Sequence, residues 1–514
     1  MLTRSFMAPE EQSKLLAYTP MLHARLYAQE ERYRRAHFQP TRPDDENHNN
    51  TNKPEKEREP AQDPWLDGNP AIDRPLFVQF CANDPAHLLE AAKKVAPYCD
   101  AVDLNLGCPQ GIARKGHYGA FLQEEQDLVF RLINTLHREL SIPVTAKIRI
   151  LEDDQATLAY ARNVLRAGAS ILTVHGRRRE QKGHLTGTAD WRVLRFLRES
   201  LPPETVLFAN GNVLQGGDVD ACLAATGMDG VMSAEGNLSD PAIFGRAPAE
   251  DEEGREYWRG KKDGKGGWRV DAVTRRYLDI IHKYVQGRDP PARRPLFVPG
   301  DDTTWLEPQA AEEDEENADG QPPRKKQKKQ KQQKQQQQQE SGKKAKDPGP
   351  NIGAIQPHLF HVLRHFVTRH TDVRDMLARA PKAGLDAYER VLTAVEERVA
   401  AGLLEYERTG GKSWEDEVAE LMAREDGVEG ESSVATLKRC KRPWWVVQPI
   451  IRPLPKEAMA KGAIRPTKKD LEKQEGEKEP PKKDAPVEKK EKEEEQRPTE
   501  IQKDIASRDE LVSG

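Results

Sequence analysis

The chain has 514 residues, of which 32% are charged and only 36% are apolar, and its formal net charge is −4. Its five cysteines are widely scattered and form no C-x-x-C pair, which argues against a disulfide framework or a zinc site and indicates a reducing compartment. No apolar run approaches the roughly 20 residues of a membrane-spanning helix, and the N-terminus lacks the apolar core of a secretory signal. We therefore expect a cytoplasmic or nuclear protein of two or three domains, much of which lies outside any core.

A regular alternation of strand and helix patterns begins at Pro75, after a strand-like stretch at 17–21 and a polar insertion at about 39–73. The strand patterns lie at 76–80, 101–106, 144–150, 171–175, 206–210 and 230–233, and the helical patterns lie at 86–95, 126–140, 156–167, 191–201 and 218–226. This alternation predicts βαβ units and a parallel sheet. We favour an α/β fold with a (β/α)8 TIM barrel over residues 1–250, rather than an open doubly wound sheet.

Chemically suggestive residues lie at the end of successive predicted strands or directly after it. They are Asn105, Cys108, Lys147, His175, Asn210, Gly211, Asn212, Ala234 and Glu235. Each has an ordinary structural explanation, such as an inert buried thiol, a solvent-facing lysine or a turn residue. In a barrel, however, the carboxyl ends of all strands meet at one mouth, so we expect these residues to lie close together. The loops after the last two strands are the usual phosphate site of such barrels, which predicts a phosphate-bearing cofactor.

Six blocks of sequence carry a resemblance to a known family. They cover residues 75–85, 103–110, 115–122, 172–177, 208–212 and 230–237, and the second contains Asn105-Leu106-Gly107-Cys108-Pro109. In this order they resemble the flavin-dependent tRNA-dihydrouridine synthases, in particular the eukaryotic branch that modifies uridines 16 and 17 of the tRNA D-loop. The resemblance covers about residues 15–245, less the polar insertion.

The resemblance implies that the protein reduces the C5–C6 double bond of a uridine in tRNA, with FMN as cofactor and NADPH or NADH as reductant. Cys108 matches the family's catalytic acid, which protonates C5 after hydride has added to C6. An ordinary thiol has a pKa of about 8.5 and is mostly protonated at neutral pH, so it suits this role. The implied cofactor-binding residues are Gln79, Asn105, Lys147, His175, Asn210, Gly211, Asn212, Ala234 and Glu235. Arg177 is assigned to an RNA phosphate, and no metal or membrane is implied.

The family pattern is broken at the beginning of the chain. Relatives start with a strand that ends in Ala-Pro-Met and is followed by a helix, whereas this chain offers only residues 7–13 for that segment before Leu15. We therefore expect the first strand to be missing or truncated, either because the sequence is incomplete, which we prefer, or because the protein binds FMN weakly. The alternative function is a catalytically silent tRNA-binding paralogue. A flavin barrel acting on a free pyrimidine is disfavoured by the helical extension.

Beyond the barrel, apolar spacings of three and four predict helices at 268–285, 357–377 and 385–404. We expect a helical RNA-binding domain over residues 251–300 and 351–410, and it resembles the one that follows the barrel in this family. Its candidate tRNA contacts are Arg275, Arg276, Arg364 and Arg369. A basic helical face is often only solvated surface.

Two charged segments separate and follow these helices. Residues 301–350 form a basic, glutamine-rich linker that could serve nuclear localisation, RNA tethering or neither. Residues 411–514 form a mostly disordered charged tail, interrupted by Trp444 and Trp445. Paired tryptophans could stack on unpaired bases or dock the tail onto the folded domain, and we favour docking.

Overall fold

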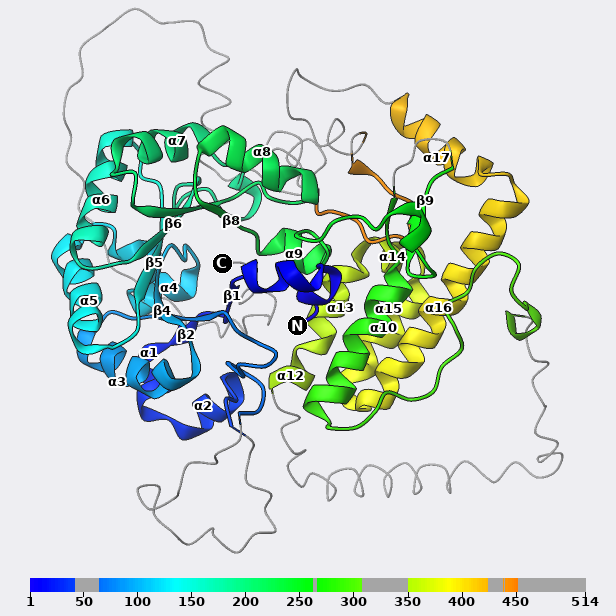
Figure 1. Cartoon of the computed structure of the whole chain (residues 1–514), viewed down its shortest axis with the longest axis horizontal. Coiled ribbons are helices and arrows are strands. Elements are labelled where there is room, and N and C mark those ends of the chain that lie inside the picture. Colours follow the sequence, from blue (N-terminus) through cyan, green and yellow to red (C-terminus); the bar gives the residue numbers. More distant parts are fainter. Residues whose placement is uncertain (42–63, 262–265, 307–349, 424–437, 439, 452–514) are drawn as a thin grey trace, which may run out of the picture.

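The computed structural model describes residues 1–41, 64–261, 266–306, 350–423, 438 and 440–451 (Figure 1). The linker predicted at 301–350 lies outside the described residues from 307 to 349. The centre of the polar insertion (42–63) and most of the charged tail also lie outside them. No helix in the described ranges combines the length and apolarity needed to cross a bilayer.

A curled parallel sheet forms the first half of the molecule and confirms the predicted order of strands. Its strands are β1 (Ala17–Tyr18), β2 (Leu22–His23), β3 (Leu76–Cys81), β4 (Ala101–Leu106), β5 (Val144–Arg149), β6 (Ile171–His175), β7 (Val206–Asn210) and β8 (Gly230–Met232). β1 and β2 both pair with β3 and occupy one strand position that is interrupted around Pro20, which has no N–H to donate. Among the described strands no ladder joins β1 to β8, so the sheet is a half-barrel with two edges.

Helices between the strands cover the convex face of the sheet, and most of them turn an apolar stripe toward it. They are α3 (Pro85–Val95), α5 (Gln126–Glu139), α6 (Asp154–Arg166), α7 (Trp191–Ser200) and α8 (Gly216–Thr226). In α5, Val129, Leu132, Ile133 and Leu136 are spaced by three and four and are fully buried. They pack against alternate strand residues such as Leu104 and Ile148, which places the apolar core outside the barrel wall and leaves the other strand face for polar side chains.

The second half is a helical domain with its own core (Figure 1, right). It contains α10 (Val270–Ile280), the π-helical turn η8 (Ile281–Val285), α12 (Pro350–Gly353), α13 (Ile355–Val362), α14 (Arg364–Arg369), α15 (Thr371–Arg379), α16 (Leu385–Arg408) and α17 (Lys412–Met422). The N-terminal turns η1 (Arg4–Phe6) and η2 (Pro9–Lys14) lie between the two halves. Phe6 packs edge-on against Trp268 with ring centroids 4.8 Å apart, and an Arg4 guanidinium nitrogen donates to Pro75 O at 2.9 Å. The N-terminal segment therefore joins both cores.

Three predicted boundaries were wrong. Residues 357–377 form three short helices rather than one continuous helix, with breaks at Leu363 and His370. The polar insertion is shorter than predicted, since Leu66 is buried and Thr41 pairs with Pro64. The tail is ordered beyond residue 410, because α17 continues the helical domain.

The paired tryptophans dock onto the folded domain, as we favoured. Residues 440–451 run beside the hairpin β9 (Tyr257–Arg259) and β10 (Gly266–Trp268), where Val447 N donates to Trp268 O at 2.9 Å. Trp445 is buried, and Trp444 lies against α16 so closely that a Cβ at Gly402 would come within 2.4 Å of its ring. Both rings are therefore committed to packing inside the protein.

Candidate active site

The polar residues predicted at the strand ends lie together on the inner face of the half-barrel. Strand register places Asn105 of β4 directly opposite Lys147 of β5. One step further along the strands, Arg149 of β5 lies opposite His175 of β6, which lies opposite Asn210 of β7. All five side chains are buried. The structure thus brings together groups that are separated by up to a hundred residues in the sequence.

A chain of hydrogen bonds runs from the barrel interior to the cysteine turn. Thr145 Oγ1 donates to Asp103 Oδ1 at 2.6 Å, and Gln79 Nε2 donates to Asp103 Oδ2 at 2.8 Å. Asn105 Nδ2 then donates to Gln79 Oε1 at 2.8 Å. Asn105 Oδ1 accepts from the backbone N–H of Gly107 at 3.0 Å and from that of Cys108 at 2.9 Å. Asn105 therefore fixes the turn that carries the thiol.

Three ionisable groups share this interior. Burial raises the pKa of Asp103 to about 6, although Thr145 and Gln79 oppose the rise by hydrogen bonding to the carboxylate. Burial, together with the nearby Arg149, lowers the pKa of Lys147 to about 8. Both values leave the carboxylate and the ammonium group charged at pH 7. With the Arg149 guanidinium as the third group, the interior carries one net positive charge, which could attract an anionic group.

Arg149 is a site residue that the sequence reasoning missed. Its Nε donates to Gly107 O at 2.6 Å and its Nη1 donates to Arg178 O at 3.1 Å, so one guanidinium connects the cysteine turn with the loop after β6. Burial lowers its pKa to about 10, which still leaves it charged at neutral pH. The signal was present, because Arg149 lies two residues after Lys147 and so shares its face of the strand.

The Cys108 side chain lies in a small cluster with Cys81, Ala113 and Tyr118. Burial raises the pKa of the Cys81 thiol to about 12, so this second cysteine is protonated at neutral pH. Gly119 has a φ of +66°, and a Cβ there would lie 2.8 Å from Cys108 O. A larger residue at position 119 would clash with Cys108, so the turn can close against the cysteine only with glycine there.

Arg177 is not placed to contact an RNA phosphate, so this prediction was wrong. The residue is buried, and its guanidinium donates to Gly187 O at 3.0 Å and to Asn212 Oδ1 at 2.5 Å. It also lies 3.1 Å from His175 Nε2. Because arginine can only donate, His175 Nε2 is the acceptor and the neutral ring carries its proton on Nδ1. Arg177 thus orients His175 instead of binding substrate.

The phosphate end of the site is predicted at the loops after β7 and β8. Gly211 has a φ of +109°, and a Cβ there would lie 2.7 Å from the Ala189 Cβ and 3.0 Å from the His175 ring. Asn210 Nδ2 donates to Met232 O at 2.9 Å, whereas its Oδ1 is buried without a hydrogen-bond partner in the described part of the chain. After β8, Ala234 and Glu235 begin the short helix α9 (Glu235–Ser239). The glycine backbone at Gly211 and the free acceptor of Asn210 would both suit a bound polar group.

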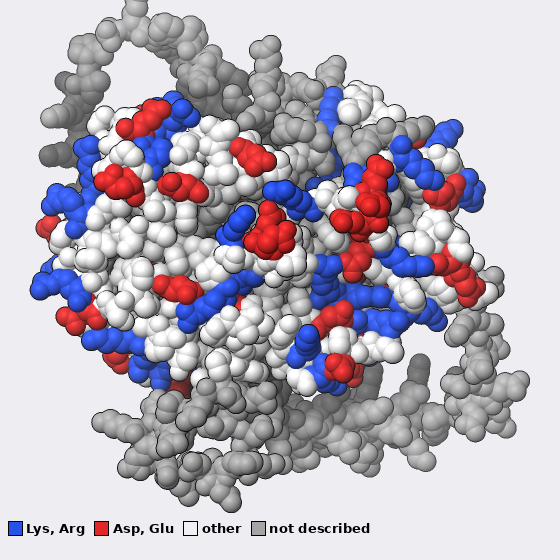
Figure 2. All heavy atoms as spheres, viewed as in Figure 1, with Lys and Arg blue, Asp and Glu red and all other residues white. Residues whose placement is uncertain are grey.

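Two of the four predicted RNA-binding arginines in the helical domain are paired with acidic residues of the same protein. Arg275 Nη2 donates to Glu396 Oε1 at 2.7 Å, with 17% of each side chain exposed. Arg276 pairs with Glu256 and stacks over the Phe6 ring at 4.3 Å. Figure 2 shows basic and acidic side chains interspersed over this face. Arg364 and Arg369 are exposed, and Arg369 stacks over Trp444 at 5.3 Å.

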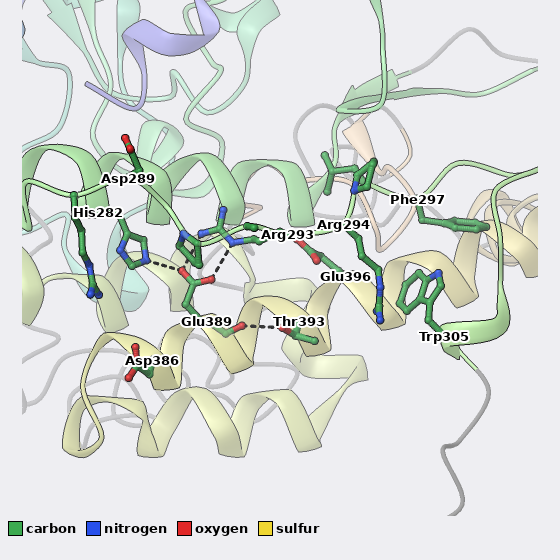
Figure 3. A pocket seen from close by; sticks show the side chains of 15 residues that line it. His282, Asp289, Arg293, Arg294, Phe297, Trp305, Asp386, Glu389, Thr393 and Glu396 are labelled. Atoms are coloured by element: carbon green, nitrogen blue, oxygen red, sulfur yellow. Dashed lines mark hydrogen bonds and ion pairs between the residues drawn. The ribbon is translucent and has the colours of Figure 1, made fainter.

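A cavity of about 500 Å³ lies in the helical domain, and its lining residues all come after residue 281 in the sequence (Figure 3). Its walls come from the segment after η8 and from α16. Glu389 accepts from Arg293 Nη2 at 2.9 Å and lies 2.8 Å from His282 Nε2, so its charge is already matched. Within the described residues no three potential ligands gather to hold a metal ion. The polar edge of the half-barrel therefore remains the candidate active site.

Comparison with known proteins agrees with this geometry. A sequence model of the family described as dihydrouridine synthase (Dus) matches residues 3–288. The chain belongs to the dihydrouridine synthase family. A protein of Saccharomyces cerevisiae named tRNA-dihydrouridine(16/17) synthase [NAD(P)(+)] is 37% identical over 442 residues, which are 85% of this chain and 78% of the relative. A protein of the same name from Schizosaccharomyces pombe is 38% identical over 440 residues, 85% of this chain and 82% of its own.

The resemblance found in the sequence is thus confirmed at the level of the dihydrouridine synthase family. Among solved structures, DHODH in complex with ferulenol from Eimeria tenella matches 32% of this chain and 53% of its own, with a TM-score of 0.27 and 15% identity. The family match includes every strand of the half-barrel and ends in the helical domain, just after η8. It therefore contains both the cysteine turn and the loops after β7 and β8.

Proposed function

We propose that this member of the dihydrouridine synthase family reduces the C5–C6 double bond of uridines 16 and 17 in tRNA. The observation that carries the proposal is the convergence of Asn105, Cys108, Lys147, His175 and Asn210 on one edge of the half-barrel. The names of the two yeast relatives supply the substrate and its positions. NAD(P)H is the proposed reductant for the same reason.

A flavin is the proposed cofactor, and we assign FMN because the loops after β7 and β8 suit a single terminal phosphate. Lys147, Gln79 and Asn210 would hold it from the strand ends, and Gly211 and Ala234 would approach its phosphate through their backbone. When bound, the flavin supplies the hydride that adds to C6 of uracil. The Lys147 ammonium group would favour the extra electron density of the reduced cofactor.

Cys108 completes the reaction by protonating C5. Hydride addition at C6 leaves negative charge on C5 and the adjacent carbonyl, and the thiol proton goes to C5 as the new C–H bond forms. The resulting thiolate recovers a proton from solvent. Asn105 keeps the turn in place during this step through its two backbone hydrogen bonds. His175, oriented by Arg177, lies on β6, next to the strand that carries Lys147, where it can contact the cofactor or the base.

The tRNA itself is the proposed macromolecular partner, and a cytoplasmic or nuclear location follows from that substrate. Arg364 and Arg369 remain the proposed contacts of the helical domain with tRNA phosphates, because both are exposed. The rival function, a silent tRNA-binding paralogue, is not favoured, since the thiol, the hydrogen bonds that fix its turn and the buried lysine are all in place.

Two measurements test the proposal. The purified protein should show flavin absorbance and release FMN on denaturation. The tRNA of cells that lack the gene should have uridine at positions 16 and 17, and re-expression should restore dihydrouridine there. A colourless folded protein, or unchanged dihydrouridine after deletion of the gene, would overturn the proposal.

A further inference from the structure

Two exposed apolar side chains flank the cysteine turn, and the proposed function does not use them. Ile112 lies on α4 (Gly111–Gly116), directly after the turn, and is 57% exposed. Leu185 ends the short turn η6 (Gly183–Leu185) in the loop after β6 and is 46% exposed. Single exposed apolar residues are ordinary on a protein surface. Here, however, two of the four large apolar side chains that are exposed in the described ranges border one catalytic turn.

The two loops that carry these side chains are held side by side. Lys182 Nζ, three residues before Leu185, donates to Pro109 O at 2.6 Å, three residues before Ile112. Arg149 adds a second connection through Gly107 O and Arg178 O. Both apolar side chains therefore belong to loops that hydrogen bonds hold against the cysteine turn.

Exposed basic side chains lie on the two elements that carry this apolar pair. Arg114 and Lys115 on α4 are exposed, and α4 contains no acidic residue. Arg178 and Lys182 on the opposite loop are exposed as well, although this loop also carries the exposed Glu180 and Arg178 lies 3.9 Å from Glu152. Apolar side chains among cations complement a partner that combines negative charge with flat apolar faces. A single RNA strand has this combination, since phosphates alternate along it with the faces of the bases.

Resting on the proposed function, we propose that Ile112 and Leu185 contact the bases next to the target uridine and take its place in the stack. An enzyme that acts on C5 and C6 must extract the base from its neighbours, which costs stacking energy. Apolar side chains inserted at such a step hold the neighbouring bases apart. Ile112 and Leu185 are positioning residues in this proposal, because they touch the flanking nucleotides and not the reacting atoms.

The test compares the double variant Ile112→Ala, Leu185→Ala with wild type and with Met422→Ala, a control of similar exposure (49%) on α17. The substrates are an unmodified tRNA transcript and a short unpaired RNA with the same D-loop sequence. We expect the double variant to keep its flavin absorbance and lose about tenfold in kcat/KM on the folded tRNA. On the unpaired RNA it should lose less than about twofold, because little stacking has to be broken.

A second readout separates this proposal from the proposed function. A transcript with 2-aminopurine beside the target uridine becomes more fluorescent when that base unstacks, whether or not reduction follows. Wild type and Met422→Ala should raise the emission, and the double variant should not. Equal emission and equal kcat/KM for all three proteins would overturn the inference and would point to a protein partner for the apolar pair. Normal emission with wild type but no dihydrouridine would overturn the proposed function alone.

Discussion

Replacing Asn105 with alanine tests how the cysteine turn is held. The substitution removes the oxygen that accepts from the buried N–H groups of Gly107 and Cys108, and it removes the donor to Gln79 Oε1. Leaving a buried donor without an acceptor costs about 1–3 kcal/mol. Two such donors would cost about 2–6 kcal/mol, and water entering the vacated space would reduce the loss to about 3 kcal/mol.

The assay is urea unfolding at constant pH, with amide hydrogen exchange of the peptide around Cys108 as a local readout. Asn163→Ala on α6 is the matched control, because the Asn163 side chain donates to Gln126 and its side-chain oxygen accepts from no backbone N–H in the described hydrogen bonds. It should cost about 1 kcal/mol and leave exchange at the turn unchanged. If Asn105→Ala costs no more than the control and exchange at Gly107 and Cys108 does not accelerate, the turn is held by something other than Asn105.

The remaining predictions concern charge. Because the pKa of folded Lys147 is about 8, below the 10.5 of the unfolded chain, the folded state binds fewer protons between these pH values. The free energy of unfolding should therefore rise by about 3 kcal/mol from pH 8 to 10.5 in wild type but not in Lys147→Met, as pH-dependent urea unfolding would show. Arg442→Ala leaves the buried Asp240 carboxylate unpaired and should cost about 3 kcal/mol, with faster proteolysis of residues 440–451. The exposed control Arg408→Ala should cost under about 0.5 kcal/mol.

The strands and the catalytic edge could be predicted because local patterns determine them. Alternating apolar residues such as Val102, Leu104 and Leu106 define a strand, and the chain order of strand ends determines which polar residues meet. Asn105, Lys147 and Asn210 were found in this way, and the structure places the first two on the neighbouring strands β4 and β5 and the third on β7, beyond β6. The roles assigned to them remain predictions until variants are measured.

The errors arose where the partner of a residue is far away in the sequence. Arg275 was expected to bind RNA, but its partner Glu396 lies 121 residues later and cannot be recognised from the basic helix pattern. Arg177 was misassigned for a similar reason, since it is satisfied by Asn212 on the next strand loop. The contact of the docked tail could not be predicted for the same reason, because the backbone N–H of Val447 donates to the carbonyl oxygen of Trp268, far away in the sequence.

The account depends most directly on Cys108 as the proton donor. Pre-reduced, flavin-loaded protein would be mixed anaerobically with unmodified tRNA, and flavin reoxidation and dihydrouridine would be followed together. We expect Cys108→Ala to keep its flavin and its tRNA binding but to form dihydrouridine at least about 100-fold more slowly than wild type. The Cys81→Ala variant should retain the wild-type rate within about threefold, because its thiol donates no proton to C5. Equal rates for wild type and Cys108→Ala would contradict the central claim.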